Sequence, residues 1–302
     1  LVDAHGLITD WRREEIAGDV RTLEVKAGKG VPLSAVGCGL DGALAAHLAN
    51  RFVRAKQAIQ LSYRQTDDGA SARPTSGGIS IEPEVAFVKV NPASSGSSGQ
   101  PVWLEWQSRP LAHRSVVLGV HRTNVAEVLA EEQMKEVFRP KARLWRQFSG
   151  SEGEVRRYCP VADDPAAKLF HEKVLPLSQC GPMVRKKTSA EVIAAVAMDP
   201  QGIAFVDYTA IPKDNKSIKV LGIVTDKGIV RPEPRTILDG TWPISQQYYL
   251  YVNPKASETA KDFAKFIVSG ACADVFRKHG MVPASPQKLE FPAAAATQPA
   301  GK

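Results

Sequence analysis

The chain has 302 residues, of which 43% are hydrophobic and 24% are charged, and its formal net charge is +7. No stretch approaches the roughly 18 consecutive apolar residues of a membrane-spanning helix, so we expect none. The basic residues are scattered and lack interleaved aromatic residues, which argues against nucleic-acid binding. The length suits one large domain or two lobes of roughly 100 to 150 residues.

The first clear unit is a strand, a glycine-rich turn and a helix. Residues 31–36 are apolar and predict a strand, and Gly37 and Gly39 mark the turn after it. Asp41 suits the N-cap of the helix. The helix then repeats apolar residues on one face: Leu44, Leu48 and Phe52. Such a unit often binds anions, because the backbone N–H groups at the helix start lack partners.

Strands and helices alternate along the rest of the chain. The predicted strands are residues 58–63, 85–90, 115–120, 203–208, 219–223 and 248–252. The predicted helices are residues 125–137, 165–174, 189–198 and 257–268, and a last helix that ends at His279. Asp164 and Pro165 suit the N-cap and the first turn of the second helix. This alternation predicts α/β lobes with mainly parallel sheets.

Sequence motifs give no sign of catalysis. A nucleophile elbow, an HExxH zinc motif, a Walker loop and a dinucleotide fingerprint are all missing, and the six histidines lack metal-ligand spacing. We therefore expect a non-enzyme without cofactor or metal. Cys159 and Cys180 can form a disulfide in an oxidising compartment or remain small buried thiols.

Four segments occur in a recognisable order. They are SRPL with the strand after it (108–120), QMKEVFRPKARLWRQF (133–148), DPQGIAFVDYTAI (199–211), and a C-terminal part from WPISQQYYLYVNP (242–254) to AKDFAKFIVSGACADVFRKHGMVP (260–283). Together they resemble the phosphate-type periplasmic solute-binding proteins of bacterial ABC importers. The resemblance covers roughly residues 30–290.

The resemblance implies an α/β fold of two lobes, the type II periplasmic-binding-protein fold, with two crossings between the lobes. The strands at residues 115–120 and 248–252 would be the hinge strands. The implied divisions are an N-terminal extension (1–29), the first part of lobe 1 (30–116), lobe 2 (117–244), the return to lobe 1 (245–290) and a disordered tail (291–302). The polar loops 67–78 and 93–100 are expected to be mobile.

The resemblance also implies a function. The chain would be an extracytoplasmic receptor, periplasmic or otherwise exported, that binds phosphate or a related oxyanion in the interlobe cleft and serves an ABC permease. The positions that match the ligand-binding segments of the family, or lie beside them, are Gly39, Leu40, Asp41, Ser108, Arg109, Arg156 and Asp164.

Two of these segments depart from the family pattern. Leu40 and Asp41 stand where the family has a hydroxyl residue, and Asp164, Pro165 and Ala166 stand where it has Ser-Gly-Thr. The family arginine falls near Pro160. A carboxylate at a helix start takes up the N–H groups that would hold phosphate, and it repels the anion. The alternative hypothesis is therefore a degenerate binding-protein fold, used as a scaffold or sensor module without phosphate binding.

Overall fold

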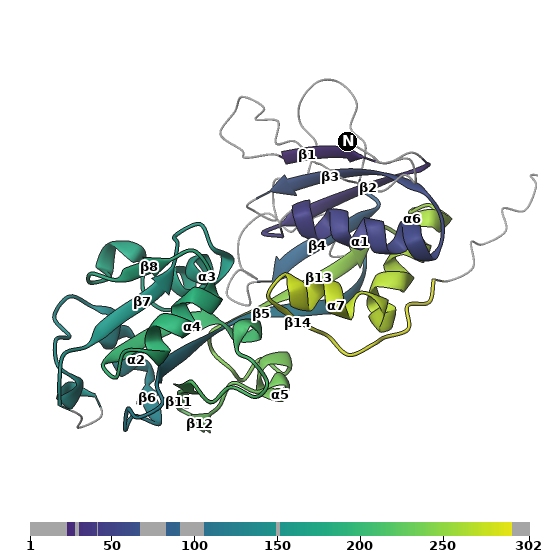
Figure 1. Ribbon diagram of the computed structural model, residues 1–302. Coiled ribbons are helices and arrows are strands. Elements are labelled where there is room, and N and C mark those ends of the chain that lie inside the picture. Colours follow the sequence, from purple (N-terminus) through teal and green to yellow (C-terminus); the bar gives the residue numbers. More distant parts are fainter. Residues whose placement is uncertain are drawn as a thin grey trace, which may run out of the picture.

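The computed structural model describes residues 23–27, 30–40, 42–66, 83–90, 106–148 and 152–291. They form two α/β lobes joined by one long strand, β5 (Gln107–His121) (Figure 1). The two-lobed fold expected from the sequence is confirmed. None of the helices in these ranges is long and apolar enough to cross a bilayer. Asp41, the loops 67–78 and 93–100 and residues 292–302 lie outside the described ranges.

Lobe 1 is a mixed sheet covered by helices. Its strands are, in spatial order, β1 (Leu23–Ala27), β3 (Ile59–Thr66), β2 (Val31–Cys38), β4 (Val85–Val90), β13 (Ser245–Val252) and the first part of β5. Its helices are α1 (Gly42–Ala55), α6 (Glu258–Phe266) and α7 (Ala273–Lys278), with a π-helical turn at Ile267–Ala271. β2 runs parallel to β3 and β4, whereas β13 is antiparallel to β4 and β5. The carboxyl ends of β2 and β4 therefore lie on the side from which β5 leaves for lobe 2.

The buried face of α1 follows the predicted pattern. Leu44, Leu48 and Phe52 are all buried. The Phe52 ring packs edge-on against Phe263 and Phe266, at centroid distances of 5.4 and 5.5 Å. Burial of one such side chain contributes about 1.5–3 kcal/mol. This packing fixes α1 on the sheet, and with it the turn that leads into the helix.

Lobe 2 contains a second sheet and a small third one. The second sheet joins the end of β5 to β9 (Gly202–Asp207), β7 (Arg156–Pro160) and β8 (Val184–Lys186), with β10 (Ile218–Val220) on the other side of β5. The small sheet is β12 (Gly228–Val230), β11 (Gly222–Thr225) and β6 (Val128–Ala130). The helices are α2 (Glu131–Phe138), α3 (Pro165–Lys173), α4 (Ser189–Ala197) and α5 (Pro234–Leu238), with 3-10 turns at Trp145–Gln147, Leu177–Gln179 and Tyr208–Ala210.

β5 belongs to both lobes through different residues. Residues 107–115 pair with β13, and residues 112–114 among them also pair with β14 (Met281–Pro283). Residues 116–121 pair with β9 and β10. The pairing thus continues through β5, but each lobe keeps its own apolar core. β5 is longer than the predicted strand because a bulge, with Leu111 as the extra residue beside Pro110, accommodates the proline in the sheet.

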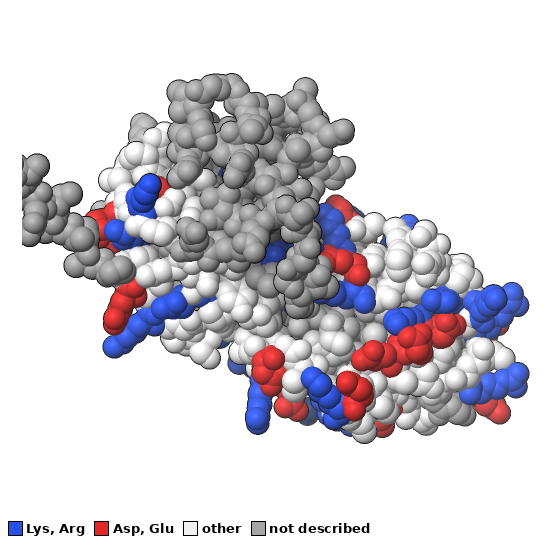
Figure 2. All heavy atoms as spheres, turned by 180° about the vertical axis from the view of Figure 1, so that it is seen from behind, with Lys and Arg blue, Asp and Glu red and all other residues white. Residues whose placement is uncertain are grey.

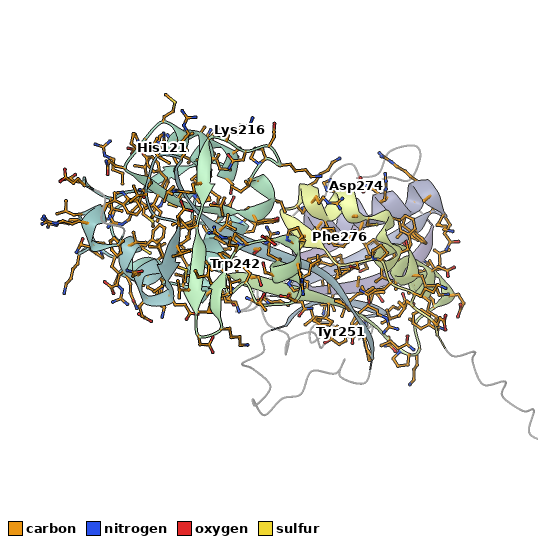
Figure 3. All side chains as sticks on the ribbon, turned by 90° about the horizontal axis from the view of Figure 1, so that it is seen from below. His121, Lys216, Trp242, Tyr251, Asp274 and Phe276 are labelled. Carbon is orange, nitrogen blue, oxygen red and sulfur yellow. The ribbon has the colours of Figure 1, made fainter. Side chains whose placement is uncertain are left out.

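The chain returns to lobe 1 beside its outward crossing. The Val116 N–H and the Ser115 hydroxyl donate to the Ile244 carbonyl at 2.9 and 3.3 Å. The indole N–H of Trp242, which packs in the lobe 2 core, donates to the Val116 carbonyl at 2.9 Å. Figure 3 shows Trp242 in lobe 2, while Tyr251 lies toward the far end of β13 in lobe 1. The two crossings are thus hydrogen-bonded to each other.

A third segment, β14 (Met281–Pro283), also spans the junction by pairing with residues 112–114 of β5. Met281 packs in the core of lobe 1, but Val282 packs in the core of lobe 2. Residues 245–290 were assigned to lobe 1 from the sequence, so Val282 is an exception. The reason is that successive strand residues point to opposite sides.

Three secondary-structure predictions were inaccurate, two of them in lobe 2. Residues 125–137 are not one helix, because β6 occupies part of them and α2 begins only at Glu131. The predicted strand 219–223 is two strands, since β10 pairs with β5 whereas β11 pairs with β6. The sheets are mixed rather than mainly parallel, because β5 and β13 cross between the lobes in opposite directions. Each difference depends on pairing between distant segments.

Cys159 and Cys180 are both free thiols, so the structure has no disulfide between them.

The charged residues show no large patch of one sign on the face seen in Figure 2, where basic and acidic side chains are interspersed.

Candidate functional site

The turn between β2 and α1 is held by two tyrosines. The Tyr63 hydroxyl donates to the Leu40 carbonyl at 2.7 Å, and the Tyr248 hydroxyl donates to the Gly39 carbonyl at 3.3 Å. Gly39 has a φ of +69°, which an L side chain rarely adopts. The Leu40 side chain is buried in the lobe 1 core. Gly39 and Leu40 therefore offer only their backbone to a ligand, at the carboxyl end of β2.

Gly37→Ala is expected to displace Tyr63 and to disorder this turn. A Cβ at position 37 would lie 1.6 Å from the Tyr63 hydroxyl oxygen, far inside van der Waals contact. We expect a loss of about 1–3 kcal/mol in the free energy of unfolding, measured by urea denaturation. Tyr63→Leu removes both the hydroxyl oxygen and the ring carbon Cζ, which would lie 2.6 Å from that Cβ, so Gly37→Ala should cost less in a Tyr63→Leu background. An equal cost in both backgrounds would contradict this account.

In lobe 2, Asp164 caps α3 as predicted. Its Oδ1 accepts from the Ala166 N–H at 2.8 Å. Pro165 has no N–H, so the first turn of α3 has one donor fewer. The Asp164 carboxylate therefore already supplies a negative charge at the start of α3, and this weakens the binding of an external anion there.

Ser108 and Arg109 do not lie beside the turn. Ser108 pairs with Tyr251 on β13, whose partner Ala86 on β4 faces Val36 on β2. Three strand spacings of about 4.8 Å, roughly 14 Å, thus separate Ser108 from β2. The Arg109 guanidinium donates to the Ser108 and Lys288 carbonyls, at 2.8 and 3.4 Å.

Arg156 lies at the wrong end of its strand for this site. It begins β7 and pairs with Gly202, whereas the interlobe end of the same sheet holds Asp207, which pairs with Val116. The exposed Arg156 side chain forms an ion pair with Asp199 at 3.6 Å. The structure therefore leaves Gly39, Leu40 and Asp164, of the predicted residues, near the junction of the lobes.

Sequence analysis missed a buried ion pair at the hinge. The Arg114 guanidinium on β5 donates to Asp207 Oδ2 at 3.2 Å and to the His279 carbonyl at 2.8 Å. Asp207 Oδ1 also accepts from the N–H and hydroxyl of Thr209, at 2.9 and 2.8 Å. Burial raises the pKa of Asp207 to about 6, against the opposing effect of Arg114. The charged Asp207 within the apolar sequence GIAFVD was the available signal.

His113 lies beside this ion pair on β5 and is almost completely buried. Among the described residues, its Nδ1 has no hydrogen-bond partner. Burial lowers the pKa of His113 to about 4, although the carboxylate of Asp239 acts in the opposite direction. The hinge therefore contains two titratable groups with opposite pKa shifts: the pKa of His113 is lowered and the pKa of Asp207 is raised.

A second ion pair joins the lobes away from the hinge. Lys89 Nζ on β4 lies 2.5 Å from Glu172 Oε2 on α3, and both side chains are partly exposed. The Lys89 side chain also covers the turn, since its Cδ lies 3.2 Å from the position that a Gly39 Cβ would take. Lys89 thus links the turn of lobe 1 to the helix that Asp164 caps.

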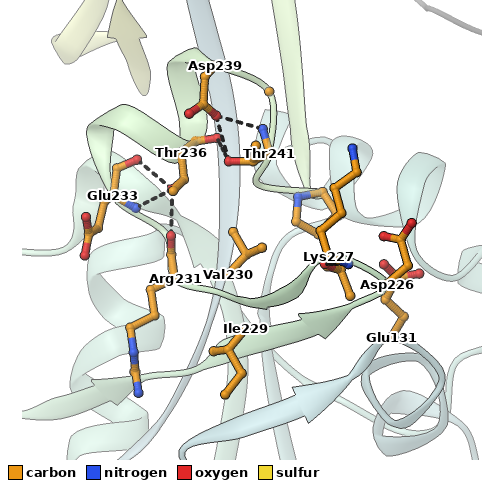
Figure 4. Close-up of a pocket in the computed structure, with 13 residues that line it drawn as sticks. Glu131, Asp226, Lys227, Ile229, Val230, Arg231, Glu233, Thr236, Asp239 and Thr241 are labelled. Carbon is orange, nitrogen blue, oxygen red and sulfur yellow. Dashed lines mark hydrogen bonds between the residues drawn. The ribbon is translucent and has the colours of Figure 1, made fainter.

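A groove of about 670 Å³ lies on lobe 2, between the β11–β12 hairpin, α5 and residues 239–243 (Figure 4). Its acidic residues are Glu131, Asp226, Glu233 and Asp239, and its basic residues are Lys227 and Arg231. The excess of carboxylates does not suit an anionic ligand. Within the described ranges, no three His, Cys, Asp or Glu side chains converge to hold a metal ion.

Curated relatives match part of this chain. The phosphate-binding protein PstS of Staphylococcus saprophyticus is 24% identical over 172 residues, which is 55% of this chain and 54% of that protein. PstS of Staphylococcus haemolyticus is 22% identical over 170 residues, 54% of each chain. The chain thus spans about half the length of the curated relatives that it matches.

Solved structures share the fold. A possible phosphate binding protein from Planctomyces limnophilus superposes with a TM-score of 0.66 at 13% identity, covering 84% of this chain and 94% of that one. PstS from Borrelia burgdorferi superposes with a TM-score of 0.63 at 11% identity, covering 84% and 99%. At these identities the likeness concerns the fold alone.

Family membership follows from the sequence itself. Residues 82–271, well over half of the chain, match the family described as PBP superfamily domain. This match spans both crossings between the lobes and the whole of lobe 2. The resemblance to phosphate-type solute-binding proteins is confirmed by the relatives above, and the chain belongs to the PBP superfamily domain family.

Proposed function

We propose that the protein is an extracytoplasmic solute-binding receptor of the phosphate type, periplasmic or otherwise exported. It would hold a small ligand between its two lobes and present it to an ABC permease. The observation that carries the proposal is the architecture: two lobes with separate cores meet through two adjacent crossings. Such hinges allow lobes to close around a ligand.

The ligand is proposed to be phosphate or a related oxyanion. The names of the PstS relatives support this choice, and so does the rigid glycine turn before α1. We place the site at Gly39, Leu40 and Asp41 of lobe 1 and at Asp164 of lobe 2. Ser108, Arg109 and Arg156 are left out of the proposed site because strand pairing holds them elsewhere.

The alternative, a degenerate fold used as a scaffold or sensor, is separated from this proposal by a binding screen. Thermal unfolding would be measured in the presence of phosphate, sulfate, molybdate, arsenate or phosphonates. A ligand that binds the folded state raises the midpoint temperature of unfolding. A receptor is expected to show a rise in the unfolding midpoint with at least one oxyanion. No response to any of them would favour the scaffold.

Removing the two carboxylates, by Asp41→Thr with Asp164→Ser, is expected to increase phosphate affinity by about tenfold or more. The change replaces the carboxylate at the Ala166 N–H by a neutral hydroxyl, which can also donate to an anion, and removes two negative charges near the anion. Titration calorimetry of both forms at one ionic strength would measure the effect. Glu152→Ser, a change at an exposed residue before β7 and away from the lobe junction, is the control and should leave the affinity unchanged. Weaker phosphate binding by the double variant would place these carboxylates in a supporting role instead.

A further inference from the structure

Lys89 occupies an unusual position on its strand. Val85 and Phe87 precede it with the same strand parity and are packed in the lobe 1 core. Lys89 points to the same side, because side chains alternate along a strand. It is the last but one residue of β4, at the end of the strand that faces lobe 2. Its aliphatic stem therefore passes over Gly39, with Cδ 3.2 Å from the position that a Gly39 Cβ would take, and the ammonium group reaches toward lobe 2.

The partner of Lys89 comes from the other lobe. Glu172 lies near the end of α3, and its carboxylate is 2.5 Å from Lys89 Nζ. The two residues are 83 positions apart in the chain. Side-chain exposures of 28% for Lys89 and 40% for Glu172 leave the pair open to exchange with a dissolved ion. A carboxylate that is bound this way occupies the place of an anionic ligand.

From this geometry we propose that Lys89 is the cationic ligand-binding residue of the receptor and that Glu172 is its internal competitor. The inference rests on the proposed function and specifies the ligand class as a small anion. Without ligand, the ion pair holds lobe 1 to lobe 2. A bound oxyanion at the turn competes with Glu172 for Lys89, because two anions at one ammonium group repel each other.

The two partners give variants with opposite expected effects. Lys89→Met keeps most of the aliphatic stem but removes the charge, and phosphate affinity should fall about tenfold or more. Glu172→Gln removes the competing carboxylate, and phosphate affinity should rise about threefold to tenfold. In the double variant, Glu172→Gln should not raise phosphate affinity above that of Lys89→Met, because the ammonium group that it would release is absent. Calorimetric titration with inorganic phosphate at one ionic strength measures all three.

A matched control lies within lobe 2. Lys219 and Glu127 form an ion pair of 2.6 Å with similar exposure of the lysine, at 23%. Lys219→Met should leave phosphate affinity unchanged. If Lys89→Met binds phosphate as the unmodified protein does, or if Glu172→Gln weakens binding, the inference is overturned while the receptor function stands.

A ligand-free measurement keeps the inference testable if no anion binds. Small-angle X-ray scattering should give a larger radius of gyration for Glu172→Gln and for Lys89→Met than for the unmodified protein and Lys219→Met. Equal radii would overturn the role of the ion pair in joining the lobes. Absence of binding by the unmodified protein, together with larger radii in the two variants, would reject the proposed receptor function and retain the interlobe ion pair.

Discussion

Arg157→Leu is expected to lower the free energy of unfolding by roughly 3–5 kcal/mol. The Arg157 side chain is buried, and its Nε donates to the Val137 carbonyl at 2.6 Å. Its Nη2 donates to the carbonyls of Arg139, at 3.1 Å, and of Ala142. These carbonyls belong to the end of α2 and the segment after it, and the Arg139 carbonyl also accepts from the Ala142 N–H at 3.2 Å. Leucine would leave all three without this donor in the interior of lobe 2.

The neighbouring residue is the control for this prediction. Arg156→Leu changes the same residue type, but that side chain is mostly exposed and forms an ion pair with Asp199. Exposed ion pairs contribute about 1 kcal/mol or less. Urea denaturation of both variants would compare them directly. Similar losses in the two proteins would contradict the role assigned to Arg157.

His113→Gln is expected to stabilise the protein against acid by roughly 3 kcal/mol, relative to the unmodified chain, when the pH falls from 7 to 4. The pKa of His113 is lowered from 6.5 to about 4 in the folded state. Its contribution to stability is therefore complete above pH 6.5 and is lost as the pH falls toward 4, because only the unfolded chain takes up the proton. Glutamine does not titrate and removes this loss.

Asp207→Asn is expected to show the opposite change, also of roughly 3 kcal/mol. The pKa of Asp207 is raised from 3.8 to about 6, so its contribution is complete below pH 3.8 and is lost as the pH rises through 6. On acidification, Asp207 raises the free energy of unfolding of the unmodified protein while His113 lowers it. In Asp207→Asn only the decrease caused by His113 remains. Unfolding free energies at pH 7, 5.5 and 4, taken as variant minus unmodified protein, isolate each group. Parallel profiles for both variants and the unmodified protein would show that these two groups do not control the pH dependence.

Local signals were sufficient where the structure depends on neighbouring residues. Ser257 was predicted to cap a helix, and its hydroxyl accepts from the Ala260 N–H at 3.2 Å. Gly270 was predicted to interrupt the helical segment, and its φ of +90° does so. Asp164 caps α3 for the same reason, since a short polar side chain reaches the first free N–H groups. These features need only a few consecutive residues.

The candidate site was predictable in part. The glycine turn and Asp164 were found because each sits at a helix start with a recognisable sequence. Ser108 was chosen from its sequence context, but the bulge at residues 110–112 and the pairing with β13 decide where it lies. Lys89 gave only a weak signal, because its importance depends on Glu172 in the other lobe.

Short-range backbone preferences and side-chain periodicity were sufficient to predict the alternation of strands and helices, the caps and the apolar face of α1. The order of the segments carried the resemblance that implied two lobes. Contacts between distant segments appear only in the folded chain: β5 serves both lobes, Val282 enters the core of lobe 2, Arg114 meets Asp207 and Lys89 meets Glu172. Those contacts join residues far apart in the chain, and no local preference specifies which distant partner a charged side chain or a strand edge will find.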